Sequence, residues 1–456
     1  MHRLAVALSS ILLVFAVALA VKVPADASAP NLQITLPGTN TPRPAGFATN
    51  TPSVPSDTPT NTSTPTSTPT ATATPTATFT PTSTPTDTPT ATDTPSPTPT
   101  PIGPIYYPDN INPLTGLEYP DEAAMARRNL IVKISNYPPV VRPQSSVNLA
   151  DVVYEVEAEG GVTRFAAIFR SNMPTHVGSV RSGRLLDLEL VPMYNALLAY
   201  SGTSEPIQRL FMASEYVYQL FSPLKGDNCE EAGFCRFPQP GLAFEHTLFL
   251  DTTVLYDLAT RRNVNTGYKA RGFAFNATPD PGGLPANDVF IDWYGQTDAR
   301  WQYDPSTGRY LRYTDSVAHF DANDGQQLWA DNLIIIQVPH ERRPDLFEPG
   351  VSYESLEIQL WDQGRAYLVR DGMFYQGYWR RQDREPGSAL QIIYGNNAPI
   401  MMKPGRTWVS IVRGFGDVII SEQKPDMNAT GTAVVGSATP SPTWTPGPSP
   451  TPDPNS

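Results

Sequence analysis

Apolar and polar residues alternate along two adjacent stretches in the first half of the chain, 150–159 and 162–169. A period of two is typical of β-strands, and the Gly160–Gly161 pair between the stretches favours a hairpin. Strands interleaved with helices predict an α+β or α/β domain with a mixed sheet over residues 103–275. The other predicted elements are strands at 129–135 and 195–200, and helices at 121–127, 182–190, 204–213 and 252–262.

The second half contains short alternating stretches separated by turn residues. The Asp371–Gly372 pair lies between two of them and is a strong signal for a hairpin turn. We therefore predict a mainly antiparallel β domain over residues 285–425, built as a sandwich or a partly open barrel. Its strands are expected at 289–293, 309–313, 333–338, 355–360, 364–370, 373–380, 390–394 and 408–412.

Threonine and proline dominate the two stretches that flank these domains, residues 30–102 and 428–456. Proline removes backbone donors and large apolar residues are scarce, so neither stretch can bury a core that offsets the entropy of ordering. Both are predicted to be disordered. The longer one is an extended spacer, a stalk whose threonine hydroxyls either carry O-linked glycans or stay unmodified.

The first 29 residues begin with a basic Met-His-Arg and continue as an apolar stretch that ends in small residues. This pattern is typical of a secretion signal, and the alternative is an uncleaved N-terminal helix that anchors the protein in a membrane. Either interpretation predicts an extracytoplasmic protein, secreted or attached to the cell surface. No cysteine follows the apolar stretch, so we do not expect a lipid on cysteine.

The formal net charge is 32 − 44 = −12, and an acidic chain repels phosphate backbones, so nucleic acid is not an expected partner. The two cysteines, Cys229 and Cys235, lie in one polar stretch, and in an oxidising compartment they predict a local disulfide. No histidine lies within ten residues of them, which disfavours a metal site. No nucleotide or cofactor fingerprint occurs, so no cofactor is expected. The sequence does not indicate an oligomeric state.

Glu155 and Glu157 lie two residues apart on the first strand of the predicted hairpin. Alternate residues of a strand share a face and lie about 6.6 Å apart, a separation compatible with two carboxylates acting on a glycosidic bond. The same pair suits a hard cation, which prefers oxygen ligands. The simplest interpretation is a solvated face on which Arg164, across the hairpin, neutralises one of the acids.

Arg181 and Arg184 lie three residues apart at the predicted start of a helix. Arginine side chains beside free N–H groups form a receptor for an anion, such as a sugar carboxylate, a phosphate or a peptide C-terminus, and Arg164 joins them as a candidate ligand. The alternative is a pair of salt bridges to the acidic face of the hairpin. His246, in an apolar setting with a carboxylate neighbour, is either a structural residue or a general base.

Several motifs occur in a fixed order along both halves of the chain. They include NPLTGL at 112–117 and KPGRTW at 403–408, and the others lie at 142–144, 150–155, 159–165, 180–184, 331–332 and 364–380. In this order they resemble the YerB-like family of bacterial envelope proteins. The resemblance implies two consecutive domains, export that is commonly as a lipoprotein, and no established biochemical activity. This chain departs from the family in lacking a lipid-attachment cysteine and in carrying the long stalk.

Two functions fit these observations. The favoured one is a binding or scaffolding module for an envelope polymer or a partner protein, because the chain has a stalk and no catalytic signature. The alternative is a cell-wall glycan hydrolase or transglycosylase that uses the paired carboxylates Glu155 and Glu157, or His246. This alternative requires the candidate groups to converge in one cleft.

Overall fold

The computed structural model describes residues 100–427, with gaps at residue 295, residues 348–353 and residue 382. These residues all belong to one compact unit. The predicted signal or anchor at 1–29, the stalk up to residue 99 and the tail at 428–456 lie outside the described residues. Within the part of the chain that is described, no helix is both long enough and apolar enough to span a membrane.

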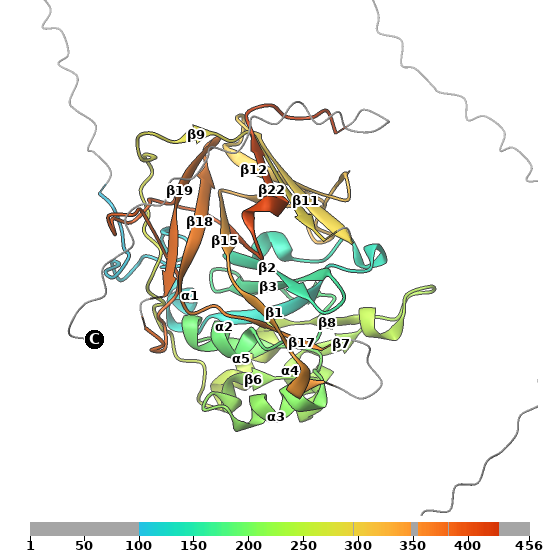
Figure 1. Cartoon of the computed structure of the whole chain (residues 1–456). Helices are drawn as coiled ribbons and strands as arrows, with labels where there is room; N and C mark the ends of the chain where they lie inside the picture. The colour runs from blue at the N-terminus through green and yellow to red at the C-terminus, as the bar shows by residue number, and fades with distance from the viewer. Residues whose placement is uncertain (1–99, 295, 348–353, 382, 428–456) are drawn as a thin grey trace, which may run out of the picture. The chain divides into compact units, whose positions relative to one another are not determined.

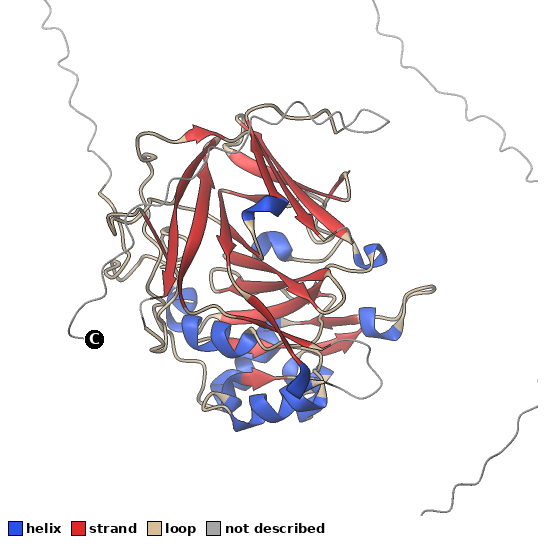
Figure 2. Ribbon diagram, viewed as in Figure 1, coloured by secondary structure: helices blue, strands red, loops and turns tan. Residues whose placement is uncertain are grey.

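A sheet of eleven strands, here called the central sheet, takes strands from both halves of the chain (Figures 1 and 2). Strand β21 from the C-terminal half lies between β15 and β2 and is parallel to both. The two regions predicted as consecutive domains therefore share one sheet. In spatial order the strands are β20 (Gln391–Ile393), β19 (Met373–Arg381), β18 (Asp362–Arg370), β15 (Asn332–Gln337), β21 (Thr407–Val412), β2 (Val152–Ala158), β3 (Val162–Phe169), β1 (Leu130–Ser135), β5 (Leu197–Ala199) and β6 (Leu220–Phe221), with β9 (Leu284–Pro285) beside β19.

A second sheet, of six antiparallel strands, is built from the C-terminal half alone. Val289 and Trp301 of this sheet belong to the same buried cluster as Val153 and Trp408 of the central sheet, so the two sheets pack face to face. The strands are β13 (Val317–Ala318), β12 (Arg309–Thr314), β11 (Thr297–Asp304), β10 (Asp288–Trp293) and β22 (Val418–Ser421), with β14 (Trp329–Ala330) beside β12.

Two smaller sheets and several helices complete the described part of the fold. One sheet pairs β16 (His340–Arg343) with β17 (Ser355–Ile358), and the other has the order β4 (Val177–Gly178), β8 (Leu248–Leu250), β7 (Phe234–Arg236). The α-helices are α1 (Glu122–Ala126), α2 (Asp187–Tyr194), α3 (Glu205–Ala213), α4 (Cys229–Ala232) and α5 (Thr252–Arg261). Short 3-10 helices lie at Pro139–Val141, Val147–Leu149, Val217–Gln219, Pro223–Lys225, Phe244–His246, Pro344–Leu346 and Phe415–Asp417.

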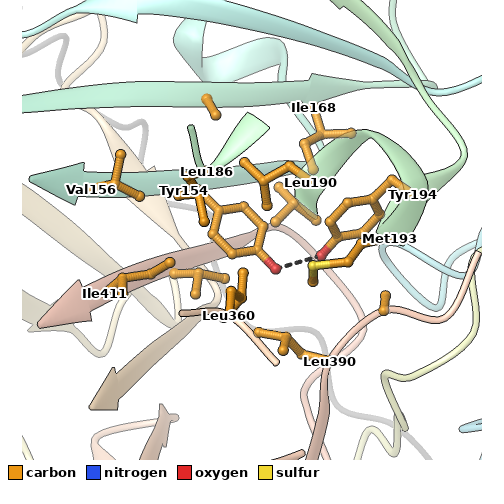
Figure 3. Close-up of a cluster of buried hydrophobic side chains, with 14 of the residues drawn as sticks. Tyr154, Val156, Ile168, Leu186, Leu190, Met193, Tyr194, Leu360, Leu390 and Ile411 are labelled. Carbon is orange, nitrogen blue, oxygen red and sulfur yellow. Dashed lines mark hydrogen bonds between the residues drawn. The ribbon is translucent and has the colours of Figure 1, made fainter. Parts of the chain in front are cut away.

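The face of the central sheet that points away from the second sheet is covered by α2 and by loops of the C-terminal half. Tyr154 of β2 and Tyr194 of α2 are fully buried there, with their hydroxyl oxygens 2.7 Å apart (Figure 3). Leu360 and Leu390 from the C-terminal half belong to the same apolar cluster. Burial raises the pKa of both tyrosines, and their shared hydrogen bond gives each buried hydroxyl a partner.

The predicted fold class is confirmed: the first half combines a mixed sheet with helices, and the second half is mainly antiparallel β. Asp371 and Gly372 have φ angles of 51° and 74° and form the predicted turn between β18 and β19. Strand β11 was not predicted from the sequence. The residues of β11 that face the core at its start are Thr297, Ala299 and Trp301, and two of these three are small or polar, which weakens the alternating pattern.

Cys229 and Cys235 form the predicted disulfide, with a sequence separation of six. Reducing it is expected to lower the free energy of unfolding by about 2 kcal/mol, because so short a loop removes little entropy from the unfolded chain. Urea unfolding with and without reductant measures the change. The Cys229→Ser/Cys235→Ser variant should match the reduced protein under both conditions. A wild-type midpoint that reductant leaves unchanged would contradict this expectation.

Candidate functional site

The carboxyl ends of several parallel strands meet at one edge of the central sheet. β15, β21 and β2 are parallel to each other, β3 is antiparallel to both β2 and β1, and β1, β5 and β6 are again parallel. Ligands of open α/β sheets bind outside the carboxyl ends of the strands. We call this the carboxyl edge and define it by residues 135–136, 157–159, 199–201 and 412–413, which end or directly follow β1, β2, β5 and β21.

Glu155 is buried between the two large sheets, and the positive charge of Arg312 balances the charge of its carboxylate. Its carboxylate contacts both terminal nitrogens of Arg312, with Nη1–Oε2 and Nη2–Oε1 distances of 2.8 and 2.9 Å, and both side chains have no exposed surface. Thr163 donates to Oε1 at 3.0 Å and the Trp408 indole donates to Oε2 at 3.2 Å. Because every lone-pair direction is already used, Glu155 is a structural acid that joins the two halves of the protein.

Glu157 also has an arginine partner. Arg413, directly after β21, donates from Nε and Nη2 to the two carboxylate oxygens at 2.8 and 2.7 Å. Burial raises the pKa of Glu157, and the hydrogen bonds and charge of Arg413 oppose that rise. Neither Glu155 nor Glu157 is therefore available as a free acid or base, and the structure gives no support to a hydrolase built on this pair.

The prediction that Arg164 neutralises this acidic face is wrong because the hairpin loop is one residue longer than assumed. A two-residue loop at Gly160–Gly161 would pair Arg164 with Glu157. The observed register pairs Ala158 with Val162, and so Arg164 with Val156. A slip of one residue moves a side chain to the opposite face of a sheet. Arg164 therefore points away from the two glutamates, and the face that was expected to be solvated is covered by the second sheet.

A buried polar network continues from Arg312 to His319. The Arg312 Nε donates to His319 Nδ1 at 3.2 Å, and His319 Nε2 lies 2.6 Å from Gln144 Oε1. This pattern assigns the ring proton to Nε2, so the imidazole is neutral. Burial, reinforced by the charges of Arg312 and Arg142, holds the pKa of His319 well below its ordinary value.

Residues 179–184 pack across the carboxyl ends of β1 and β5. Ser135 N–H donates to Ser179 O, and Arg181 N–H donates to Lys133 O, so this segment extends the central sheet where β1 ends. On the other side, Ser201 N–H donates to Arg181 O. Ile134 pairs with Val180, and both belong to the cluster under the second sheet, so alternation places the side chains of Ser179 and Arg181 on the opposite face.

The helix predicted from residue 182 begins five residues later, at Asp187. The Asp187 carboxylate accepts from Arg184 N–H at 2.7 Å and from the Lys133 ammonium at 2.8 Å, and Lys133 and Asp187 are completely buried. The first N–H groups of α2, those of residues 187–189, already donate to the backbone oxygens of Arg184, Leu185 and Leu186. The predicted receptor made of free N–H groups at this helix start is wrong, and only the arginine side chains can hold an anion here.

The register places Arg164 and Arg181 on the same face at the end of β1, and Arg184 follows three residues after Arg181. We call these three residues the arginine site. Arg184 pairs with Glu159, with an Nε–Oε2 distance of 2.5 Å. Arg181 donates from Nη1 to the backbone oxygen of Glu245 at 3.2 Å. Among residues 100–427, outside the three gaps, no hydrogen-bond partner is found for the buried Nη1 of Arg164 or Nε of Arg181. Neither of these two arginines pairs with a described carboxylate.

Two buried polar groups border the arginine site. Ser179 is 3% exposed and His246 is 6% exposed, and within the described residues the Ser179 hydroxyl and His246 Nδ1 have no hydrogen-bond partner. Burial lowers the pKa of His246, and the charge of Arg181 lowers it further. Burial also lowers the pKa of Arg181, while the charge of Glu245 opposes the change; a guanidinium nevertheless stays protonated. The arginine site thus contains two guanidinium groups, those of Arg164 and Arg181, that form no ion pair with a described carboxylate. The neutral side chains of Ser179 and His246 can add further polar contacts to a bound anion.

The predicted site residues therefore separate into two groups. Arg181 and His246 come together with Arg184 and Arg164 nearby, whereas the two glutamates lie on the other face of the sheet. A cavity of about 400 Å³ contains none of these six residues; it is lined mainly by Pro139, Pro143, Val317, Ala318 and Phe320, beside an ion pair between Arg142 and Asp315. Lys133, Ser179, Arg312 and Arg413 were not predicted from the sequence. No local motif marks Lys133, Arg312 or Arg413, because their partners are distant in sequence, and the Ser179 hydroxyl has no hydrogen-bond partner among the described residues.

The fold and the carboxyl edge define a class of two-part α+β protein in which both halves build one mixed sheet and arginines collect where the parallel strands end. Residues 114–266 match the model of the N-terminal domain of a protein of unknown function, DUF3048, and residues 289–409 match the model of its C-terminal domain. The chain belongs to this family, and the YerB-like resemblance is confirmed.

A relative and a solved structure support this assignment. A protein of Bacillus subtilis (strain 168) named "Putative lipoprotein YerB" is 26% identical over 318 residues, which cover 68% of this chain and 88% of that protein. The crystal structure of YerB protein from Bacillus subtilis superposes with a TM-score of 0.57 at 24% identity, covering 68% of this chain and 99% of that chain. The structural likeness shows that the two proteins share a fold.

Proposed function

We propose that this protein is an extracytoplasmic binding module of the cell envelope that holds an acidic group of an envelope polymer or partner protein at the arginine site. The observation that carries the proposal is the unpaired state of Arg164 and Arg181 among the described residues, beside two completed ion pairs. The whole chain carries a net charge of −12, so a surplus of positive charge here is a local feature.

The extracytoplasmic location is supported by two independent observations. The first 29 residues have the pattern of a secretion signal or an N-terminal anchor. The name of the Bacillus subtilis relative describes that protein as a lipoprotein, and lipoproteins are exported.

Replacing Arg164 and Arg181 together by alanine is expected to weaken binding of an acidic wall polymer at least tenfold. Each charge-assisted hydrogen bond contributes about 1.5–3 kcal/mol, and 1.4 kcal/mol is a factor of ten in affinity. Titration calorimetry of the full chain with purified wall polymer measures the loss, and the wild-type affinity should fall as salt is added. Arg184 stays unchanged because it neutralises Glu159.

The matched control is Arg261→Ala. Arg261 lies in α5 and, like Arg181, donates one hydrogen bond to a backbone oxygen, that of Glu231 at 3.3 Å. Its loss removes one positive charge, against two in the double variant, and should leave polymer affinity within twofold of wild type. If the Arg164→Ala/Arg181→Ala variant folds and binds as tightly as Arg261→Ala, the arginine site is not the binding site.

A further inference from the structure

The loop that joins β7 to β8, residues 237–247, carries two exposed aromatic rings beside the arginine site. Phe237 is 45% exposed and Phe244 is 68% exposed. Figure 1 shows this loop extending away from the sheets next to β7 and β8. Single exposed apolar residues need no explanation, and two large exposed rings on one loop are candidates for a contact with a ligand. We call residues 237–247 the aromatic loop.

The aromatic loop is attached directly to the arginine site. Phe244 and His246 belong to one short 3-10 helix, and the residue between them, Glu245, accepts the hydrogen bond from Arg181 Nη1. His246 is also the group whose pKa the charge of Arg181 lowers. The Arg181 guanidinium is therefore hydrogen-bonded to the backbone of the residue that follows Phe244.

Both rings are held in place by contacts on one side. Arg236 donates from Nη1 to Phe244 O at 2.6 Å, and its guanidinium lies 3.6 Å from the centre of the Phe244 ring. Phe237 packs edge-on against His176 at 4.8 Å between ring centres, and His176 in turn stacks on Phe249 at 4.1 Å. Rings fixed in this way lose little conformational entropy when a ligand covers their free sides.

We propose that the ligand of the arginine site is an acidic glycan, with a sugar ring packed on Phe244 and its carboxylate or phosphate held by Arg181. This inference rests on the proposed function and names its ligand class. An aromatic ring offers an apolar surface to the C–H groups of a sugar, and a guanidinium binds a carboxylate or phosphate through paired, charge-assisted hydrogen bonds. An acidic sugar carries its C–H groups and its carboxylate or phosphate at neighbouring positions, so one sugar can contact Phe244 and Arg181 together.

A membrane surface is the competing ligand for exposed rings beside arginines. The net charge of −12 opposes the approach of anionic lipid and of acidic glycan alike, so the charge does not decide between the two ligands. One side of the Phe244 ring is also covered by Arg236, so the ring cannot present a wholly apolar surface for insertion. The packing of Arg236 on the Phe244 ring thus favours the glycan.

The test is a binding titration of the full chain with four probes: an oligosaccharide of uronic acids, the same oligosaccharide with its carboxyls reduced to alcohols, a sugar-phosphate polymer, and inorganic phosphate. Phe244→Ala is expected to weaken binding of the acidic glycans at least tenfold and to leave phosphate binding within twofold. Arg181→Ala should weaken binding of both glycan and phosphate. Tyr106→Ala, which removes a ring that is 87% exposed elsewhere, should change neither.

The outcomes separate the two proposals. Unchanged glycan affinity in Phe244→Ala would overturn the glycan inference, and the proposed function would stand if Arg181→Ala still weakened binding. Unchanged affinity for every probe in Arg181→Ala would overturn both. Equal affinity for the uronic acid oligosaccharide and its carboxyl-reduced form, with no binding of the sugar-phosphate polymer, would overturn the glycan inference alone. Binding of phosphatidylglycerol vesicles that depends on Phe244, without glycan binding, would make the aromatic loop a membrane contact instead. Whichever acidic glycan binds more tightly identifies the source of the acidic group.

Discussion

Replacing Arg312 by alanine is expected to lower the free energy of unfolding by about 3–5 kcal/mol. The guanidinium and the Glu155 carboxylate are both completely buried, and their two contacts are 2.8 and 2.9 Å long. Without Arg312, a carboxylate would remain between the two large sheets with no opposite charge. Domains are typically stable by only about 5–15 kcal/mol, so this variant should unfold at a much lower urea concentration than wild type.

Two control variants separate the lost charge pair from a general effect of substitution. Glu155→Leu/Arg312→Leu removes both charges and fills the space with apolar groups, so it should be more stable than Arg312→Ala. Arg209→Ala breaks the exposed pair with Glu205 and should change stability little. Urea unfolding followed by tryptophan fluorescence compares all four proteins. An Arg312→Ala variant as stable as Arg209→Ala would show that the buried pair does not hold the halves together.

Lowering the pH from 7 to 5 is expected to destabilise the protein through His319. The folded pKa of His319 is held well below its ordinary value, whereas an unfolded histidine binds a proton near pH 6.5. Below that pH the unfolded chain therefore holds one more proton than the folded protein. The stability that neutral His319 contributes is complete above pH 6.5. As the pH falls below this value, the free energy of unfolding decreases by about 1.4 kcal/mol for each pH unit.

Other groups add to the pH dependence, so the measurement must isolate His319. His340, whose pKa is lowered to about 4 mainly by burial, acts in the same direction. Glu157, whose pKa is raised by burial, acts in the opposite direction, because the folded state binds its proton at a higher pH than the unfolded chain. Urea unfolding at pH 7, 6 and 5 should show a shallower pH dependence in His319→Gln than in wild type. Equal slopes in the two proteins would rule out the role of His319.

Local patterns were sufficient to predict the elements but not the surfaces that they cover. The alternation at β2 correctly placed Glu155 and Glu157 on one face of a strand. It could not show that a second sheet covers this face, since the arginine partners Arg312 and Arg413 lie 157 and 256 positions away in the sequence. The hydrolase hypothesis depended on these long-range contacts, and for that reason the sequence alone could not exclude it.

The arginine site was predicted in part. Arg181 and Arg184 stand out because they are close in sequence. The orientation of Arg164 depends on the length of the hairpin loop, and one extra loop residue placed it on the face opposite Glu157. Lys133 lies within a predicted strand that is otherwise mostly apolar. Nothing in the neighbouring sequence indicates that its ammonium is buried against Asp187.

The central claim is that Arg164 and Arg181 bind an acidic group, and the guanidinium NMR signals of the full chain test it most directly. We expect added inorganic phosphate to shift the Nε–H signals of Arg164 and Arg181 along a saturating curve, and to leave the signal of Arg261 in α5 unchanged. Single Arg→Lys variants assign the signals. If the two signals stay in place, or if they move only in step with Arg261, the arginine site does not bind an anion.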